Sequence, residues 1–460
     1  MAKSRVASRC LLVAALCTLA ACRAQAPPNI IVIVGDTLRA DRLGSYGNPR
    51  GLTPFLDSIA ERATVFRSAY AQSSWTNPSV ASVFTSRFPS QHGVITFESV
   101  LSEGEVTLAE ALREAGYATA FFSPNGLLRE DWGYGQGFDE FSEFAIPGIP
   151  GQPDHLRMPY RADYTNRHML AWLDSLKAGG RRRPPVFLYV QYMEPHSPYL
   201  PSKAALQRVL EGRKPPDLDE VNRFAFMGNV TPMEDRVLRD LQDVYDAEVL
   251  SLDTELRSLF NGLESRGLLE NAIVVVTSDH GEEFKEHGLI GHEKTLYGEV
   301  IQVPLLIALP GGSRRTDVAE VASLIDLAPT LLGLIGRPVP DSFEGRSLLP
   351  LSPGAGGRIA YSELPIPEGS TAKRYSPHVS SVVVGSHKLI AGEHGEMEYY
   401  DLKADPAERS PNALGEPERA ALREALRELR QRVARGDAKR ELKPIDDATR
   451  EQIRALGYDR

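Results

Sequence analysis

A threonine at the expected start of a helix is the first residue in this chain that could do chemistry. In the segment Ser74-Trp75-Thr76-Asn77-Pro78, Asn77 is a good helix cap and Pro78 suits the first helical position. Thr76 is then expected beside unpaired N–H groups at the positive end of the helix dipole, where anions bind readily. The same pattern also fits an ordinary capped helix, so it indicates a nucleophile only together with other residues.

Side chains of the kind that bind metals follow several predicted strands. Four short apolar, β-rich runs predict buried strands: residues 30–34, 118–122, 186–190 and 273–276. Three of these runs are followed by carboxylates and imidazoles, namely Asp36, then Glu194 and His196, then Asp279 and His280. Helical stretches between the runs predict a mostly parallel sheet covered on both faces. Because ligands bind at the carboxyl ends of such strands, we expect these side chains to converge.

Asp36, Asp279 and His280, together with the Thr76 hydroxyl, predict a site for one divalent metal ion. A threonine hydroxyl is barely ionised at neutral pH, and coordination to a cation is one way to activate it. The imidazole shifts the expected ion from Ca²⁺ towards Mn²⁺ or Zn²⁺, while Mg²⁺ and Ca²⁺ stay open.

Further polar residues are expected around this ion. His287 or His292 could protonate the leaving-group oxygen, and Lys294 could clamp a negatively charged oxygen of the substrate. A single loop histidine is more often simply solvated, but this density of polar groups after a buried strand is hard to explain by packing. Three residues are expected to bind substrate: His196, Asn77 and Arg39.

The charge and the cysteines of the chain exclude several functions. The 460 residues carry a net charge of −9, and segment 1–21 holds three positive and no negative side chains, so the remainder is at −12. Nucleic acid is therefore not an expected partner, since no basic surplus is available to displace counterions. The three cysteines are Cys10, Cys17 and Cys22, which leaves no thiol for a disulfide, a nucleophile or a metal in the folded domain.

The N-terminus predicts export. Three basic residues precede an apolar run over 11–21 that is too short to span a bilayer, which is typical of a secretory signal over residues 1–21. The run ends Leu19-Ala20-Ala21-Cys22, which resembles a bacterial lipobox with Cys22 as the lipidated residue. We expect a protein of the bacterial cell envelope that contacts the membrane only through this anchor; a plain cleaved signal is the alternative.

Two parts are expected after the signal: a catalytic domain over 22–365 and a C-terminal subdomain over 366–460. Residues 201–245 look like a helical insertion in the first part. In the second part, short strands over 382–384, 388–391 and 398–402 predict an antiparallel meander. A helix is expected to follow over 418–435, with leucines along one face.

The chain resembles the sulfatase family of the alkaline phosphatase superfamily over nearly all of its mature length. The motifs that carry the resemblance include Gly35-Asp36-Thr37-Leu38-Arg39, the Thr76 segment ending in His92-Gly93, Pro195-His196-Ser197-Pro198-Tyr199 and Ser278-Asp279-His280-Gly281-Glu282. The resemblance implies an α/β fold with a large mixed, mostly parallel sheet flanked by helices, plus a small C-terminal antiparallel sheet with a helix. It also implies hydrolysis of sulfuric or phosphoric esters.

Two departures from the family pattern bear on mechanism. Well-known sulfatases form a formylglycine nucleophile within a C/S-x-P-x-R motif, whereas this chain has Thr76 and, at the arginine position, Val80. Threonine cannot give formylglycine, so the hydrated-aldehyde mechanism is excluded. Thr37 replaces the second of the paired aspartates, which removes one metal carboxylate. Threonine nucleophiles occur in phosphodiesterases and in phosphoglycerol or phosphoethanolamine transferases of the superfamily, some with a second metal; here Glu194, His196 and His292 are the only candidates for one, and we expect a single ion.

These observations predict a metal-dependent hydrolase that acts through a covalent Thr76 intermediate on a small-molecule, glycan or lipid ester. A phosphodiester or phosphonate monoester is favoured over a sulfate ester, because a threonine sulfate would have to be hydrolysed at sulfur. Two alternatives remain. An envelope transferase would pass the same intermediate to an acceptor alcohol, and a non-catalytic binding protein would keep the pocket without turnover.

Overall fold

The computed structural model describes residues 26–143, 161–176, 183–227, 232–312, 314–354, 357–365, 378–392, 394–434, 441–447 and 450. The predicted signal segment and Cys22 lie outside these residues, so both stay predictions. Within the described part of the chain, no helix combines the length and the apolar character that crossing a membrane requires.

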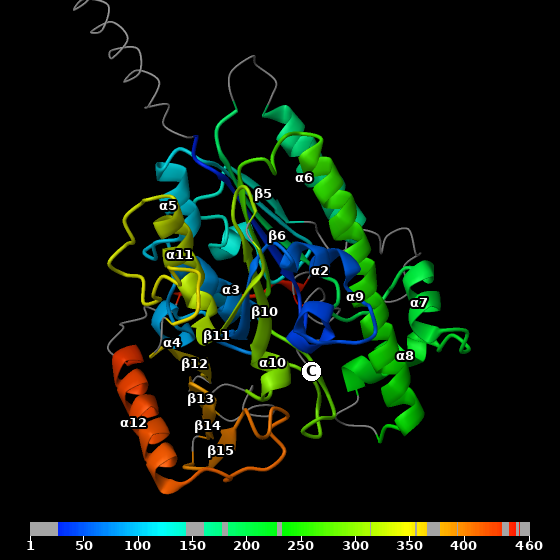
Figure 1. Ribbon diagram of the computed structural model, residues 1–460, viewed down its shortest axis with the longest axis vertical. Helices are drawn as coiled ribbons and strands as arrows, with labels where there is room; N and C mark the ends of the chain where they lie inside the picture. The colour runs from blue at the N-terminus through cyan, green and yellow to red at the C-terminus, as the bar shows by residue number, and fades with distance from the viewer. Residues whose placement is uncertain are drawn as a thin grey trace, which may run out of the picture.

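An eight-stranded sheet lies at the centre of the molecule (Figure 1). Its spatial order is β11 (Thr316–Ser323), β2 (Thr64–Tyr70), β10 (Gln302–Ala308), β7 (Ala272–Ser278), β1 (Asn29–Gly35), β6 (Val186–Tyr192), β4 (Ala118–Ser123) and β5 (Glu140–Glu143). All strands of this sheet run in one direction except β10, which is antiparallel to both neighbours. The four strands expected from apolar runs are β1, β4, β6 and β7, and they lie next to one another. The predicted α/β class with a mixed, mostly parallel sheet is confirmed.

Helices cover both faces of this sheet because its central strands are apolar on both sides. Ile30, Val32 and Val34 of β1 pack towards α3 (Thr76–Thr85), α5 (Leu108–Glu114) and α11 (Leu327–Leu334). The alternate residues Ile31 and Ile33 pack towards α2 (Pro54–Ala60), α6 (Ala162–Ser175) and α9 (Asp235–Glu264), on the opposite side of the sheet in Figure 1. All five side chains are at most 2% exposed, and each buried side chain contributes about 1.5–3 kcal/mol.

A second, antiparallel sheet forms the C-terminal part, with α12 (Glu416–Val433) packed against it (Figure 1). Its strands, in spatial order, are β12 (Ile359–Leu364), β13 (Val379–Val384), β14 (His387–Ala391) and β15 (Met397–Asp401). The expected meander and helix are confirmed. The sheet also contains β12, which lies before the expected boundary at residue 366.

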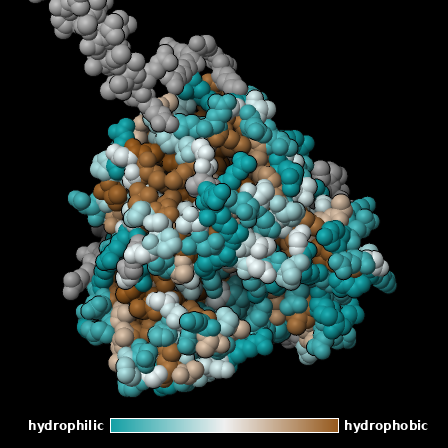
Figure 2. Space-filling view, viewed as in Figure 1, coloured by the Kyte–Doolittle hydropathy of each residue, from teal (hydrophilic) through white to brown (hydrophobic). Residues whose placement is uncertain are grey.

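The remaining elements are short or lie at the edges. They are α4 (Pro89–His92), α7 (Lys203–Leu210), α8 (Leu218–Met227), α10 (Gly298–Ile301), the paired strands β3 (Ser99–Val100) and β16 (Glu441–Leu442), and the hairpin strands β8 (Glu283–Phe284) and β9 (Ile290–Gly291). Short 3-10 turns cover Ala40–Arg42, Gly44–Tyr46, Glu130–Trp132 and Leu324–Asp326. The expected insertion over 201–245 ends inside α9, which begins at Asp235 and continues to Glu264. On the face seen in Figure 2, apolar residues of the described chain form separate groups among polar ones.

Candidate active site and metal centre

Three of the predicted metal ligands meet at the carboxyl edge of the sheet. Asp36 follows β1, while Asp279 and His280 follow the neighbouring strand β7. One ligand atom from each residue lies within 4.8 Å of the other two. All three side chains are at most 1% exposed. The parallel pairing of β1 with β7 therefore brings together residues more than 240 positions apart.

Two amide side chains hold the carboxylates in place. Asn125 Nδ2 donates to Asp36 Oδ2 at 2.7 Å, and Gln191 Nε2 donates to Asp36 Oδ2 at 3.1 Å and to Asp279 Oδ2 at 2.9 Å. The other oxygen of Asp36, Oδ1, is buried and has no hydrogen-bond partner. Burial, together with the charge of Asp279, raises the pKa of Asp36 well above its usual value. A bound cation would give Oδ1 a partner and offset the repulsion between the two carboxylates, so the residues present fit a metal ion.

The hydrogen bonding of His280 suits it as a ligand. Its Nδ1 lies 3.0 Å from the Gly281 carbonyl oxygen, which can only accept, so Nδ1 carries the proton. In the neutral ring, Nε2 then offers a lone pair, and it lies 3.7 Å from Asp36 Oδ1 and 3.6 Å from Asp279 Oδ2. A backbone carbonyl that fixes the imidazole tautomer in this way is a common second contact of metal-binding histidines.

Thr76 completes the cluster from the first turn of α3. Its Oγ1 lies 3.3 Å from His280 Nε2. Helix α3 is tied to β7 by Ser79, whose hydroxyl donates to the Asp279 carbonyl at 2.5 Å. The predicted cap at Asn77 is wrong: the helix begins at Thr76, its N-cap is Trp75, and no side chain caps it. Because Asn77 is inside the first turn, its amide is released from capping, and both Oδ1 and Nδ2 are buried without a partner. A role for Asn77 in binding substrate stays a prediction.

Two predicted histidines lie beside the cluster. The ring of His292 is centred 4.6 Å from that of His280 and 5.1 Å from that of His196. His292 Nδ1 lies 3.2 Å from Glu282 Oε1, and His196 Nδ1 donates to the Ser197 carbonyl. Burial, followed by the neighbouring His280, lowers the pKa of His196 to about 3. His196 is therefore neutral, with its proton on Nδ1 and an acceptor at Nε2.

The other predicted site residues make different contacts. Lys294 Nζ donates to the carbonyls of Ile290 and His292, at 3.0 and 3.2 Å, on the strand that leads into His292. The Arg39 guanidinium pairs with Asp41 and Glu286 and donates to the Glu282 carbonyl at 2.8 Å. Arg39 thus anchors the backbone at Glu282, while Asp41 and Glu286 neutralise its charge.

His287 lies at the tip of the β8–β9 hairpin, away from His280 and His292. Its ring nitrogens contact Glu299 Oε1 at 2.6 Å and the Glu408 carbonyl at 3.0 Å. The structure thus places the two histidines of this hairpin in different surroundings, and a catalytic role for His287 stays a prediction.

Glu194, the carboxylate weighed for a second metal, contacts another helix. Its Oε1 accepts from the Ala162 amide at the start of α6, 2.8 Å away, and burial raises its pKa to about 7. Among the described residues, the one group of three or more ligands within metal-binding distance is that of Asp36, Asp279 and His280.

Sequence reasoning missed Asn125 and Gln191. Gln191 was hidden in the buried strand β6, although a glutamine inside the run Val186–Tyr192 is itself a signal of a polar partner. Asn125 follows β4, as the metal ligands follow their strands, and its backbone N–H is bound by Ser123. Both residues could have been found by asking which polar side chains end the central strands.

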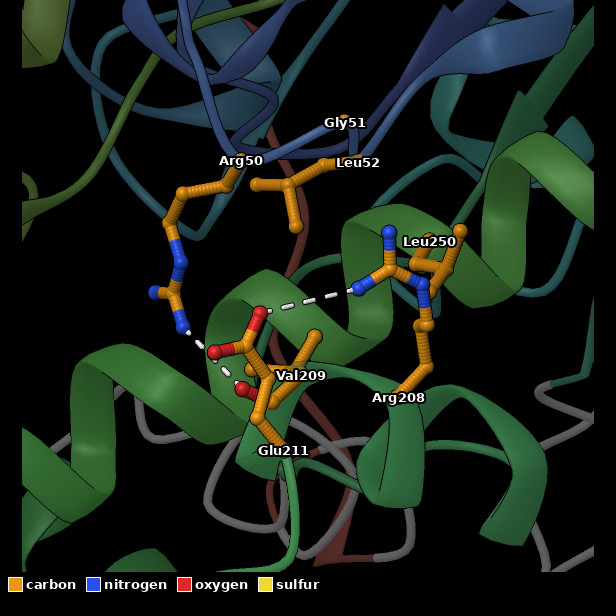
Figure 3. A pocket seen from close by; sticks show the side chains of 7 residues that line it. All are labelled: Arg50, Gly51, Leu52, Arg208, Val209, Glu211 and Leu250. Carbon is orange, nitrogen blue, oxygen red and sulfur yellow. Dashed lines mark hydrogen bonds and ion pairs between the residues drawn. The ribbon is translucent and has the colours of Figure 1, made fainter.

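A shallow depression lies elsewhere, between the loop at Arg50 and helices α7 and α9 (Figure 3). Arg208 pairs with Glu211 across 3.8 Å, and Arg50 donates to the Val209 carbonyl at 3.4 Å. None of the predicted site residues lines it. Arg50 is in turn paired with Asp243 and Asp246, so the charges of the depression have partners of their own and it adds nothing to the site.

A carboxylate–histidine centre at the carboxyl edge of such a sheet, beside a hydroxyl at a helix start, defines a hydrolase of the alkaline phosphatase superfamily. The sequence model of one family in it, Sulfatase, matches residues 28–337, and the model "N-sulphoglucosamine sulphohydrolase, C-terminal" matches residues 285–435. The chain belongs to the sulfatase family and is a hydrolase of ester bonds. Enzymes of that family are metal-dependent, and Asp36, Asp279 and His280 form a possible metal-binding site here.

Named relatives cover most of this chain. An ulvan-active sulfatase from Formosa agariphila is 28% identical over 423 residues, which cover 87% of this chain and 79% of that protein. An N-acetylglucosamine-6-O-sulfatase from Bacteroides thetaiotaomicron is 26% identical over 492 residues, covering 87% and 85%. The crystal structure of the phosphonate monoester hydrolase of Agrobacterium radiobacter superposes with a TM-score of 0.70 and 21% identity, covering 89% of this chain and 96% of that one. This last likeness shows a shared fold.

Proposed function

We propose that the enzyme hydrolyses phosphodiesters or phosphonate monoesters in preference to sulfate esters, through a covalent intermediate on Thr76. The observation that carries the proposal is the position of Thr76 Oγ1, buried at a helix start and 3.3 Å from the Nε2 atom of His280. A phosphonate monoester hydrolase among the structures with the same fold supports it. The glycan sulfatases among the relatives support a glycan or other small ester as the substrate.

Asp36, Asp279 and His280 would hold the metal with Thr76 Oγ1, and the bound cation would stabilise the alkoxide of Thr76 and negative charge on the substrate. Thr76 would give up its hydroxyl proton to solvent when the cation binds, and its Oγ would then form a bond to phosphorus as the bond to the leaving-group oxygen breaks. His292 would protonate that oxygen; its Nδ1 donates to Glu282, which stabilises the charged form of the ring. Asn77 Nδ2 can donate to a non-bridging oxygen.

The second half of the reaction needs a base for water. Once it has protonated the leaving group, His292 is neutral and can take the proton of the attacking water. His196 stays neutral because burial lowers its pKa to about 3, and its Nε2 can accept a hydrogen bond from a substrate hydroxyl. Water attacks phosphorus, the bond to Thr76 Oγ breaks, and free Thr76 returns. Lys294, next to His292, is placed to neutralise part of the negative charge.

The substrate preference rests on charge and on the missing formylglycine. Val80, at the position of the family arginine, is fully buried in the apolar core, so no cation replaces that arginine there. The helix start therefore offers the neutral amide of Asn77, and the neighbouring metal-binding cluster already holds the carboxylates of Asp36 and Asp279. A singly charged diester or phosphonate monoester suits such a site better than a doubly charged phosphate monoester. A sulfate ester carries the right charge, but its threonine adduct would require hydrolysis at sulfur.

A hydrolysis panel tests the proposal. The mature chain, loaded with Mn²⁺ or Zn²⁺, is assayed on an aryl sulfate, a phosphate monoester, a phosphate diester and a phosphonate monoester, with Thr76→Ala as control. We expect the diester or phosphonate to react fastest and the activity to vanish in the control. Activity that survives in Thr76→Ala would exclude the nucleophile, and Thr76-dependent sulfate hydrolysis as the fastest reaction would reverse the preference. Slow hydrolysis that an acceptor alcohol accelerates would indicate a transferase.

Export and lipid anchoring are also part of the proposal. The basic residues, the apolar run and the lipobox-like Leu19-Ala20-Ala21-Cys22 support an envelope protein anchored at Cys22. Mass spectrometry of the mature N-terminus from the bacterial host tests this, and an unmodified Cys22 would contradict it.

A further inference from the structure

The hairpin formed by β8 and β9 carries catalytic-site residues at its base. Glu283 pairs with Gly291, and Phe284 with Ile290, so Glu282 and His292 emerge side by side and interact at 3.2 Å. The short hairpin has only these two paired positions. At the base, the Glu282 amide donates to the Glu299 carbonyl at 3.0 Å and the Glu293 amide donates to the Ser74 carbonyl at 2.9 Å. Contacts at the tip add to this anchoring of the base.

His287 lies at the tip of this hairpin, where both of its ring nitrogens meet acceptors. Nδ1 is 2.6 Å from Glu299 Oε1, and Nε2 is 3.0 Å from the Glu408 carbonyl oxygen. An imidazole that donates from both nitrogens is positively charged. Burial lowers the pKa of His287, but the hydrogen bonds to Glu299 and to the Glu408 carbonyl outweigh it and raise that pKa to about 9.

The C-terminal subdomain contacts the hairpin tip through Glu408. Glu408 has its carboxylate bound at 2.8 and 2.9 Å by Lys388 Nζ, and both side chains are at most 2% exposed. Gly298 packs closely against the same carboxylate. A Cβ atom at this position would lie only 3.0 Å from Glu408 Oε1, so a larger residue would crowd the ion pair. The Glu408 carbonyl accepts the hydrogen bond from His287, and the buried ion pair between Glu408 and Lys388 thus fixes the position of this carbonyl.

An aromatic contact adds a second link between the tip and the C-terminal sheet. The Tyr297 ring stacks on His287 with centroids 3.6 Å apart and planes 8° apart. The hydroxyls of Tyr297 and Tyr400 both donate to Glu398 Oε2, at 2.9 and 2.7 Å, and both Glu398 and Tyr400 belong to β15. The charged and titratable groups that face His287 from the packed elements are therefore Glu283, Glu299, Tyr297 and Glu408 with its partner Lys388.

We propose that His287 is a positioning residue that fastens the hairpin tip to the C-terminal subdomain and thereby holds Glu282 and His292 beside the metal centre. It acts through the hairpin and does not touch the reacting atoms. Only its consequence for turnover rests on the proposed function. The fastening itself is a property of the fold, and it gives the C-terminal subdomain a role in the geometry of a site to which none of its described residues contributes a metal ligand.

Hydrogen exchange tests the fastening without any assay of activity. The readout is the exchange rate of three backbone amides in the hairpin. The Lys285 amide donates to the Leu289 carbonyl, and the amides of His287 and Leu289 donate to Glu283 Oε1. In His287→Gln we expect these amides to exchange about tenfold faster, because the variant loses about one charge-assisted hydrogen bond. His394→Gln, the same change at an exposed residue after β14, should leave it unchanged. Unchanged hairpin exchange in His287→Gln would overturn the proposal.

A second variant and a kinetic readout separate positioning from catalysis. Glu299→Gln keeps an acceptor for His287 but removes the charge, and it should loosen the hairpin in the same direction if His287→Gln does not fold. With any ester that the wild type hydrolyses, His287→Gln should lower kcat while the shape of the pH–rate profile stays the same. Loss of one limb of that profile with normal hairpin exchange would make His287 a catalytic acid instead. If the wild type hydrolyses no ester, the proposed function fails while the exchange experiment still decides the fastening.

Discussion

Replacing Asp36 with asparagine should stabilise the metal-free enzyme and abolish its response to metal. Asp36 Oδ1 has no hydrogen-bond partner, and a ligand oxygen of Asp279 lies within 4.8 Å of a ligand oxygen of Asp36. Two unit charges at that separation repel by about 3.5 kcal/mol at an effective dielectric of 20. This is an upper limit, because the raised pKa of Asp36 lets it take up a proton. In Asp36→Asn the amide nitrogen can instead face His280 Nε2, an acceptor.

The expected gain in the free energy of unfolding is therefore about 1–3 kcal/mol in EDTA, or a rise in Tm of about 1–3 °C for a chain of this length. The wild type should gain about 2.7 kcal/mol when Mn²⁺ is present at one hundred times its Kd, and the variant should gain almost nothing. Thermal unfolding followed by circular dichroism, in EDTA and in MnCl₂, measures both changes. The order of stability of the two proteins should thus reverse when metal is added.

Asp243→Asn is the matched control, because it makes the same change with the opposite expected sign. Asp243 is also buried, but Arg213 and Arg50 bind its two oxygens and lower its pKa. Its loss should cost about 1 kcal/mol, with the metal response unchanged. The reasoning would be refuted if Asp36→Asn were less stable than the wild type in EDTA, or if it kept the full metal-induced rise in Tm.

Four further predictions follow from individual contacts. Lys388→Met should destabilise the protein by about 3–5 kcal/mol, because it leaves Glu408 buried without its partner, and adding Glu408→Gln should recover most of the loss in urea unfolding. His287 has a raised pKa of about 9, so its contribution to stability should be complete below about pH 6.5 and disappear as pH rises through 9, a trend in Tm that His287→Gln should flatten. His92 has a lowered pKa of about 3 because of burial, so stability should fall as pH drops from about 6.5 towards 3, and His92→Gln should reduce that slope in acid unfolding. Gln191→Leu should weaken Mn²⁺ binding about 10- to 100-fold in calorimetry, since it frees both carboxylates; an unchanged Kd would mean that Gln191 does not orient them.

The strands that the sequence predicted are those buried on both faces. Residues 30–34, 118–122, 186–190 and 273–276 are continuous apolar runs, and they became the central neighbours β1, β4, β6 and β7. The outer strands β2, β10 and β11 were not predicted. Their sequences contain arginine, proline or acidic residues, which interrupt the apolar run, because these strands are partly exposed or bent. The reversed direction of β10 depends on its partners, and no local pattern records it.

The metal centre was predictable because its residues follow strands. Asp36, Asp279 and His280 each lie just after a buried run, and parallel strands end at the same edge of a sheet. Asn125 follows β4 and could have been found in the same way, whereas the double contact of Gln191 was not predictable. Gln191 reaches both carboxylates only because its register opposite Val34 in β1 places it at the level of the ligands.

The sequence by itself determined the class of fold, the family and the chemical types gathered at the carboxyl edge, because apolar periodicity and strand ends are local features. The tertiary structure alone distinguished His292 from His287, two histidines of one hairpin. The pairing of β8 with β9 turns His292 towards His280, while the approach of Glu299 and Glu408 binds His287 at the tip. Glu408 lies more than 100 residues after His287 in the chain. Only the packing of distant elements brings the two together, so no local pattern separates the two histidines.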